Sequence, residues 1–225
     1  MTPPSAAPPS GASPKVVVFG SSVVPSGSED YAQAQRLGML LAGAGFEVWN
    51  GGYLGTMEAV ARGVQEAGGR SVGVTIEAWD RFHPGNTWLT ETVPTPDIHE
   101  RLRRLTSVDA AIAVNGGIGT LTEVALFWSK AQLDRLVDLA VSGAQPELEK
   151  AARAGRTVEA IAHHLDAAKA KGRRPLILVG ARWASLMDAL SESLALTPTD
   201  RDLVTLVDSV EDCVPALRRL LPAAS

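Results

Sequence analysis

The sequence predicts an α/β protein of the Rossmann-like, doubly wound class, in which helices cover both faces of a mainly parallel sheet. Three observations carry this prediction. Short β-branched runs alternate with stretches of helical apolar spacing, glycines stand between the strands and the helices that follow them, and 45% of the 225 residues are hydrophobic. Parallel strands need a long crossover, usually a helix, so this alternation indicates βαβ units.

The first five elements repeat the same unit. A β-branched run at 16–19 ends in a glycine-serine turn, and apolar residues then recur at helical spacing over 30–44. Gly45 follows as a helix stop. A second strand at 46–49, a helix over 57–67 and a third strand at 71–76 continue the pattern.

The alternation of strands and helices stops at 77–96. Three prolines and one glycine there predict a loop with a short strand near Thr92 and Val93. Asp97 can cap a helix that runs to about Ser107. A buried strand follows at 110–114, then a glycine turn and a helix from about Leu121.

The last part of the chain holds a long helical segment and two more βα units. Residues 131–173 show no strand pattern, and we expect a helical insertion there, with helices near 132–142, 146–154 and 157–171. We then expect strands at 175–179 and 203–207 and helices at 183–193 and 210–221. Residues 1–14 are almost all Pro, Ser, Ala and Gly, so we expect a disordered tail before a single domain over 15–225.

Charge and cysteine content exclude several classes of protein. The 25 acidic and 21 basic residues give a net charge of −4, which argues against general nucleic-acid binding. Cys213 is the single cysteine, so an internal disulfide framework is ruled out. No apolar run approaches the roughly 18 residues of a membrane helix, and no secretory signal precedes the first strand. We expect a cytoplasmic protein.

The strongest motif is the strand-to-helix turn from Asn115 to Glu123, which reads NGGIGTLTE. The first N–H groups of a helix lack intrahelical partners, and glycines let a phosphate approach the backbone. The loop is therefore a candidate phosphate site, with Thr120 as an added donor. The alternative is a tight turn that needs glycine for positive φ. Glu123 is likewise either a first-turn acid that favours the helix dipole or a carboxylate that faces the bound ligand.

Two further glycine turns end neighbouring strands of the expected sheet. The segment Gly51–Glu58 repeats the strand, glycine, helix geometry, and Gly20–Ser22 follows the first strand. Carboxyl ends of parallel strands meet at one edge, so we expect the three turns to line one pocket. The alternative for each is a structural turn with a helix cap.

Three arginines, at positions 101, 103 and 104, precede the buried strand. A helix can turn only one or two of them inward. An inward guanidinium would supply a bidentate contact to an anion. The four histidines show no metal-ligand spacing, so we expect no metal.

With these residues in place, the chain resembles the LOG family of Rossmann-like phosphoribohydrolases. These enzymes act on cytokinin riboside 5′-monophosphates and are often mislabelled as lysine decarboxylases. The resemblance rests on the turn at 115–123, on 18–22, on 51–61, and on the strand at 175–179 with the helix that follows, and it covers about 15–130 and 174–220. It implies a homodimer without a cofactor. The phosphorylated ligand would be cleaved at its N-glycosidic bond into free base and ribose 5-phosphate.

By the resemblance, Glu123 and Arg101 are catalytic, although Arg103 or Arg104 could take the arginine's place. The residues expected to bind the phosphate or nucleotide are Gly20, Ser21, Ser22, Gly51, Gly52, Gly55, Thr56, Glu58, Asn115, Gly116, Gly117, Gly119 and Thr120.

Three positions depart from the family pattern and keep an alternative open. Asn115 stands at the motif proline, Leu102 at a lysine, and Glu58 where plant-like members have glycine. The last is similar to the relatives that include molybdenum-cofactor carriers. A non-catalytic nucleotide-binding or molybdenum-cofactor-binding carrier is therefore the alternative to the hydrolase. An interaction module built on 131–173 is a third reading.

Overall fold

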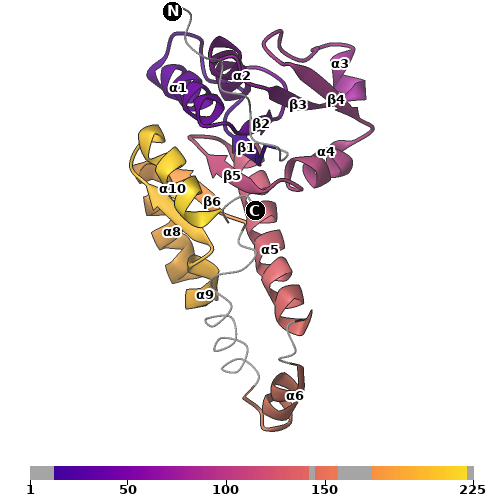
Figure 1. Ribbon diagram of the computed structural model, residues 1–225, viewed down its shortest axis with the longest axis vertical. Helices are drawn as coiled ribbons and strands as arrows, with labels where there is room; N and C mark the ends of the chain where they lie inside the picture. Colours follow the sequence, from indigo (N-terminus) through magenta and orange to yellow (C-terminus); the bar gives the residue numbers. More distant parts are fainter. Residues whose placement is uncertain (1–12, 142–144, 157–173, 222–225) are drawn as a thin grey trace, which may run out of the picture.

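The computed structural model describes residues 13–141, 145–156 and 174–221. These residues build an α/β fold around a seven-stranded, all-parallel sheet in the order β4-β3-β2-β1-β5-β6-β7 (Figure 1). The strands are β1 (Lys15–Phe19), β2 (Glu47–Asn50), β3 (Ser71–Ile76), β4 (Glu91–Thr95), β5 (Ala110–Ala113), β6 (Leu176–Val179) and β7 (Val204–Val207). The Rossmann-like fold class is confirmed.

Helices connect the strands, with one short 3-10 turn. They are α1 (Glu29–Gly43), α2 (Thr56–Glu66), α3 (Glu77–Asp80), α4 (Ile98–Leu105), α5 (Ile118–Val141), α6 (Gln145–Arg153), α8 (Ala181–Ser193), α9 (Pro198–Arg201), η1 (Val210–Asp212) and α10 (Cys213–Leu220). Most of the expected elements are present, with bounds that shift by a few residues.

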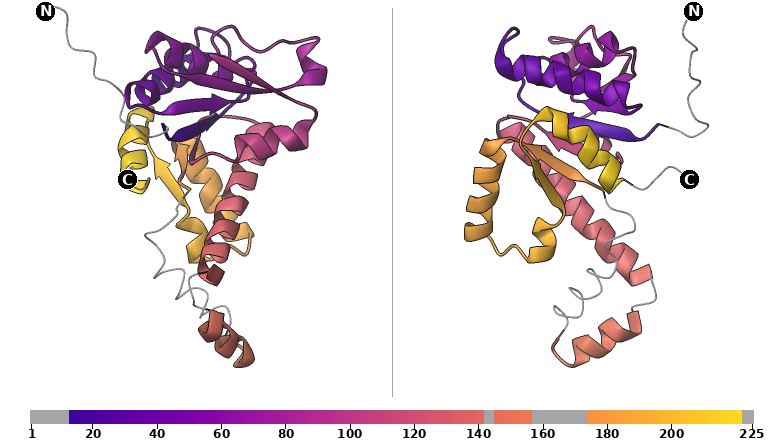
Figure 2. Two further views of the ribbon diagram at one scale, coloured as in Figure 1. Left: turned by 45° about the vertical axis from the view of Figure 1, so that its right-hand side comes forward. Right: turned by 60° about the vertical axis from the view of Figure 1, so that its left-hand side comes forward.

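Side chains of β1 alternate between two hydrophobic cores, which is why its apolar run is continuous. Val16 and Val18 pack with residues of α1, α2 and α10 on one face. Val17 and Phe19 pack with residues of α4, α5 and α8 on the other. Figure 2 shows these two helical layers on either side of the sheet. Cys213 belongs to the first core and is fully buried, which raises the pKa of its thiol to about 12.

The direction of the chain through the sheet reverses between β1 and β5. The chain builds β1 to β4 outward on one side of β1 and then returns to place β5 to β7 on the other. Ligands of open α/β sheets bind outside the carboxyl ends of the strands at such a switch point. The turns after β1 and β5 both lie at this place.

Two glycines let α1 and α2 pack with their backbones in close contact. A Cβ atom on Gly38 would lie 2.2 Å from the carbonyl oxygen of Val60, and one on Gly63 would lie 1.9 Å from that of Gln35. Neither position has room for any side chain, so the spacing of these two helices depends on both glycines.

The structure corrects two expectations about the elements. The stretch 77–96, expected as a loop with a short strand, contains α3 and the five-residue strand β4. Pro94 is tolerated in β4 because that strand lies at the sheet edge, where a ladder donor can be missing. The separate helices expected from 121 and over 132–142 are one continuous helix, α5, which begins at Ile118.

The long α5 extends past the sheet, and α6 lies beyond its end (Figures 1 and 2). The helix expected at 146–154 corresponds to α6, and the one expected at 157–171 falls outside the described residues, as does most of the expected tail at 1–14. The helix α9 was not expected. Across the described ranges, no helix combines the length and hydropathy that crossing a membrane requires.

Candidate functional site

Ser21 joins the three glycine turns through its backbone. Its N–H donates to the carbonyl oxygen of Asn115 at 3.2 Å, and its own carbonyl oxygen accepts from the N–H of Thr56 at 2.9 Å. The turns after β1, β2 and β5 therefore meet at the carboxyl edge of the sheet, as the sequence predicts.

Glycines make this close meeting possible. A Cβ on Gly20 would lie 2.4 Å from the Cγ2 atom of Thr56, and a Cβ on Gly55 would lie 2.4 Å from the carbonyl oxygen of Ser21. Gly55 also has φ of 65°, which side chains rarely adopt. The exposed Ser22 follows, with its backbone against Gly55.

The turn after β2 is fixed from within and receives Arg101. The N–H of Gly52 donates to the Oδ1 atom of Asn50 at 2.7 Å. The carbonyl oxygen of Gly51 accepts from Nη2 of Arg101 at 3.1 Å. A Cβ on Gly51 would lie 2.0 Å from that nitrogen, so glycine is needed to let the guanidinium in.

Arg101 is the inward-facing arginine of α4 and is only 7% exposed. Its Nε donates to the carbonyl oxygen of Val74 at 2.9 Å, and its Nη1 lies 3.3 Å from Oε1 of Glu123. The ring of Tyr53 stands 5.8 Å from the guanidinium carbon. The buried cation is therefore held on every side by acceptors or by an aromatic face.

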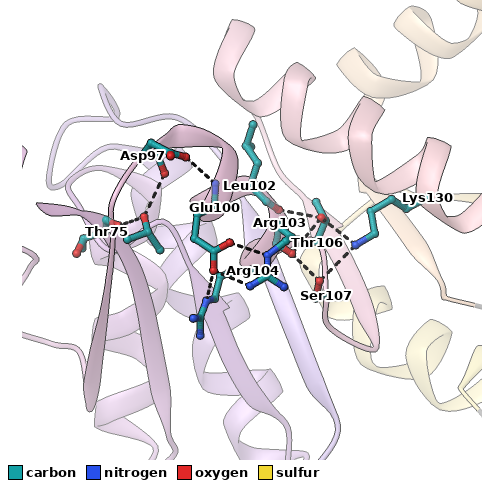
Figure 3. A network of polar contacts seen from close by, with 10 residues as sticks. Thr75, Asp97, Glu100, Leu102, Arg103, Arg104, Thr106, Ser107 and Lys130 are labelled. Carbon is teal, nitrogen blue, oxygen red and sulfur yellow. Dashed lines mark hydrogen bonds and ion pairs between the residues drawn. The ribbon is translucent and has the colours of Figure 1, made fainter. Parts of the chain in front are cut away.

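Arg103 and Arg104 point elsewhere. Figure 3 shows both turned toward the carboxylate of Glu100, at 2.6 and 2.8 Å. Their side chains are 61% and 46% exposed. Of the three candidate arginines, only Arg101 meets Glu123, which settles which of them faces the site.

Glu123 combines burial with a single cationic partner. Burial is the larger influence and raises the pKa of its carboxyl from 4.5 to about 7, against the lowering effect of Arg101. The side chain is 13% exposed. A carboxyl with such a pKa exists in both protonation states near neutral pH, as acid and base catalysts do.

Backbone strain explains none of the glycines at 116, 117 and 119, and packing explains only Gly116. Gly116, Gly117 and Gly119 all lack positive φ. A Cβ on Gly116 would meet the side chain of Thr120, but a Cβ on Gly117 or Gly119 would meet no described atom within 4 Å. The loop is exposed, and no acid occupies the first turn of α5. The alternative prediction for this loop, a tight turn that needs glycine for positive φ, is therefore wrong.

Two expected site residues make their contacts with α1 instead. Oε1 of Glu58 accepts from the hydroxyl of Tyr31 at 3.3 Å, and Nδ2 of Asn115 donates to Oδ1 of Asp30 at 3.0 Å. Neither side chain contacts Arg101 or Glu123 in the described hydrogen bonds. Thr120 is buried at the start of α5.

Sequence reasoning missed the residues that hold the turn after β2 from outside. Nδ2 of Asn86 donates to the carbonyl oxygens of Gly52 and Tyr53 at 3.1 and 2.8 Å. The hydroxyl of Tyr53 donates to Asp80 at 3.2 Å and accepts from the N–H of Ile76 at 2.8 Å. Asn86 lies more than thirty residues from its acceptors, so no local pattern marks it.

The residues of this site lie within a match to a known protein family. The family model described as LDcluster4, the SLOG cluster4 family, matches residues 13–173. The chain belongs to the SLOG cluster4 family. The match includes the whole segment, 131–173, that we expected to be an insertion.

Two curated relatives of this SLOG protein share the name of one enzyme. It is 32% identical over 111 residues to a cytokinin riboside 5′-monophosphate phosphoribohydrolase of Mycobacterium tuberculosis, covering 48% of this chain and 59% of that one. It is 36% identical over 88 residues to a protein of the same name from Arabidopsis thaliana, covering 38% of each. An uncharacterised Archaeoglobus fulgidus protein is 36% identical over 99 residues, 44% of this chain. The matches span 38–64% of the relatives' own lengths.

Solved structures share the fold over almost the whole chain. The molybdenum cofactor binding protein of Rippkaea orientalis is 19% identical with a TM-score of 0.63, covering 93% of this chain and 98% of that one. The molybdenum cofactor carrier protein of Chlamydomonas reinhardtii is 20% identical with a TM-score of 0.61, covering 92% and 98%. At such identity the likeness establishes the shared fold.

Proposed function

We propose that this SLOG protein hydrolyses the N-glycosidic bond of a nucleoside 5′-monophosphate to a free base and ribose 5-phosphate. The observation that carries the proposal is the buried contact of Glu123 with Arg101, beside an open glycine loop that begins a helix. Two curated relatives that are named as phosphoribohydrolases support this reaction class.

The 5′-phosphate would bind at the N-terminus of α5. Gly116, Gly117 and Gly119 leave the loop backbone uncovered, and the helix dipole places partial positive charge there. The absence of steric need for glycine at 117 and 119 supports this role, because ligand access then accounts for them. The turns after β1 and β2, including Glu58, would form the remaining walls.

Glu123 would act on the sugar. In the proposed step the oxygen of a water molecule forms a bond to C1′ while the bond from C1′ to the base nitrogen breaks. The bonding electron pair leaves with the base, which takes up a proton. The ionised carboxylate accepts a proton from the water and stabilises the positive charge that develops on the sugar.

Arg101 would position this carboxylate. Its contacts to the carbonyl oxygens of Val74 and Gly51 hold the guanidinium rigidly, so that the third contact fixes Glu123. The same cation favours the ionised form of the carboxyl, while burial opposes it.

The test is release of ribose 5-phosphate from AMP and related monophosphates. Wild-type protein should release it, and Glu123→Gln should not. Glu192→Gln is the matched control, because Glu192 is an exposed carboxylate on α8. No release above the Glu123→Gln background would disprove the hydrolase.

The second candidate is a carrier that binds a phosphorylated ligand without cleaving it. It is favoured by the fact that both carboxylates near the loop already have protein partners, Glu123 with Arg101 and Glu58 with Tyr31. Calorimetric binding of a nucleotide without turnover would select this candidate. An absence of affinity for any phosphorylated ligand would reject both.

A further inference from the structure

Tyr53 is a buried aromatic residue in the turn after β2 and is only 9% exposed. The guanidinium carbon of Arg101 lies over its ring at 5.8 Å, within the roughly 6 Å over which a cation and an aromatic face attract each other. The same turn supplies the carbonyl oxygen of Gly51, which accepts from Nη2 of Arg101 at 3.1 Å. The position of Tyr53 therefore affects the guanidinium twice, through its ring and through the backbone of the turn.

The ring adds a fourth contact to the three acceptors of Arg101. The guanidinium donates to the carbonyl oxygens of Val74 and Gly51 and lies 3.3 Å from Oε1 of Glu123. Any movement of the guanidinium changes its distance to that carboxylate. The ring of Tyr53 attracts the cation and occupies the space on its side, so it limits such movement.

The hydroxyl of Tyr53 ties the turn to the end of β3. It accepts from the N–H of Ile76 at 2.8 Å and donates to Oδ1 of Asp80 at 3.2 Å. The other carboxylate oxygen of Asp80 accepts from the hydroxyl of Thr75 at 2.7 Å, and Thr75 is fully buried. Asp80 thereby joins the phenol to a fixed point of β3.

The short helix α3 makes a second contact with the same ring. Trp79 lies next to Asp80, and its ring centroid is 6.0 Å from that of Tyr53, with the two planes tilted by 47°. None of the four residues of α3 is buried, so the helix adds little to the hydrophobic cores. Its two contacts with Tyr53 connect it to the turn after β2.

We propose that Tyr53, held by Asp80, is a positioning residue that fixes Arg101 and through it the carboxylate of Glu123. The described contacts of Tyr53 and Asp80 do not include Glu123, so both residues act through Arg101. The effect on reaction rate rests on the proposed hydrolysis, whereas the effect on the carboxylate does not depend on it.

Carbon-13 NMR can follow the titration of the Glu123 carboxyl in the full-length protein. Among the described residues, Arg101 is the charged group that acts on this carboxyl, and it lowers the pKa against the larger effect of burial. Tyr53→Phe keeps the ring and loses the hydroxyl, so the pKa should rise by about 0.5 as the guanidinium loosens. Asp80→Asn should act in the same direction, because an amide nitrogen cannot accept from a hydroxyl.

Tyr31→Phe is the matched control. Tyr31 is also buried, and its hydroxyl donates to a different carboxylate, that of Glu58, at 3.3 Å. This variant should leave the pKa of Glu123 unchanged. A merely structural role of Tyr53 would lower the stability of both tyrosine variants without moving the titration of Glu123.

Kinetics with AMP separates this inference from the proposed function. If the wild type releases ribose 5-phosphate, Tyr53→Phe should lower kcat by about tenfold and leave KM unchanged, because the carboxylate acts in the transition state. If the wild type releases none, the hydrolase is disproved, and the titration of Glu123 still decides the positioning role.

A pKa of Glu123 that is unchanged or lowered in Tyr53→Phe would overturn the inference, as would an unchanged kcat in an active enzyme. Should Tyr53→Phe not fold, the same results in Asp80→Asn would overturn it.

Discussion

Replacing Glu123 by glutamine is expected to change how the stability of the protein depends on pH. Burial raises the pKa of this carboxyl from 4.5 to about 7 in the folded protein. In the unfolded chain the carboxyl ionises at its ordinary pKa. Between these two values the folded state binds a proton that the unfolded state has lost, so this group makes the free energy of unfolding fall as the pH rises.

The magnitude follows from the size of the pKa rise. A rise from 4.5 to about 7 corresponds to about 3 kcal/mol. Glutamine resembles the protonated carboxyl in size and charge, and Arg101 faces a neutral group in both cases. Wild type and Glu123→Gln should therefore be similarly stable near pH 4.5, whereas the variant should be more stable by about 3 kcal/mol at pH 8.

Urea unfolding at pH 4.5, 6 and 8 measures this difference. The comparison uses wild type, Glu123→Gln and the control Glu192→Gln, whose stability should follow wild type at every pH. A free-energy difference between wild type and Glu123→Gln that is the same at pH 4.5 and pH 8 would refute the reasoning, since a normal carboxyl gives that result.

The kcat/KM for AMP should increase as the pH rises through about 7, because the ionised carboxylate of Glu123 is the form that accepts a proton from water. Arg101→Lys should lower kcat/KM by about tenfold or more, since lysine cannot reach two carbonyls and a carboxylate at once, whereas Arg103→Lys should be neutral. Gly63→Ala should destabilise the protein by about 3 kcal/mol, because its Cβ would lie 1.9 Å from a carbonyl oxygen of α1. In the same thermal melts, Gly43→Ala should be neutral or stabilising, by up to about 1 kcal/mol, because its Cβ meets open space. An equal loss of kcat/KM in the two arginine variants would contradict the positioning role of Arg101. An equal change of stability in the two glycine variants would contradict the close packing at Gly63.

Local patterns were enough to predict the sheet and its edge. Each strand of the βα units is an apolar run that ends at a turn, and the parallel order brings the turns together. The strand β4 is longer than the sequence predicts. Its residues are mostly polar and include Pro94, which a strand tolerates only at the edge of a sheet. The sequence predicts two helical stretches, one from about Leu121 and one over 132–142, and the structure joins them in one helix, α5.

The candidate site was predictable in its residues but not in its contacts. The motif singled out Glu123, whereas the choice among three arginines needed the fold, since helix phase alone did not identify which one packs beneath the turn after β2. The contacts of Asn86 and Tyr53 join segments far apart in the sequence, and only the folded chain brings them into register.

The peptide of Ser21 has a consequence for how the site opens. One amide proton and one carbonyl oxygen tie the turn after β5 to the start of α2. Release of the first contact frees the residue that holds the second, so amide hydrogen exchange at Ser21 and Thr56 should proceed through one shared opening. A ligand that binds the loop after β5 should slow exchange at both amides together, and the two halves of the sheet edge would then respond to it as one body.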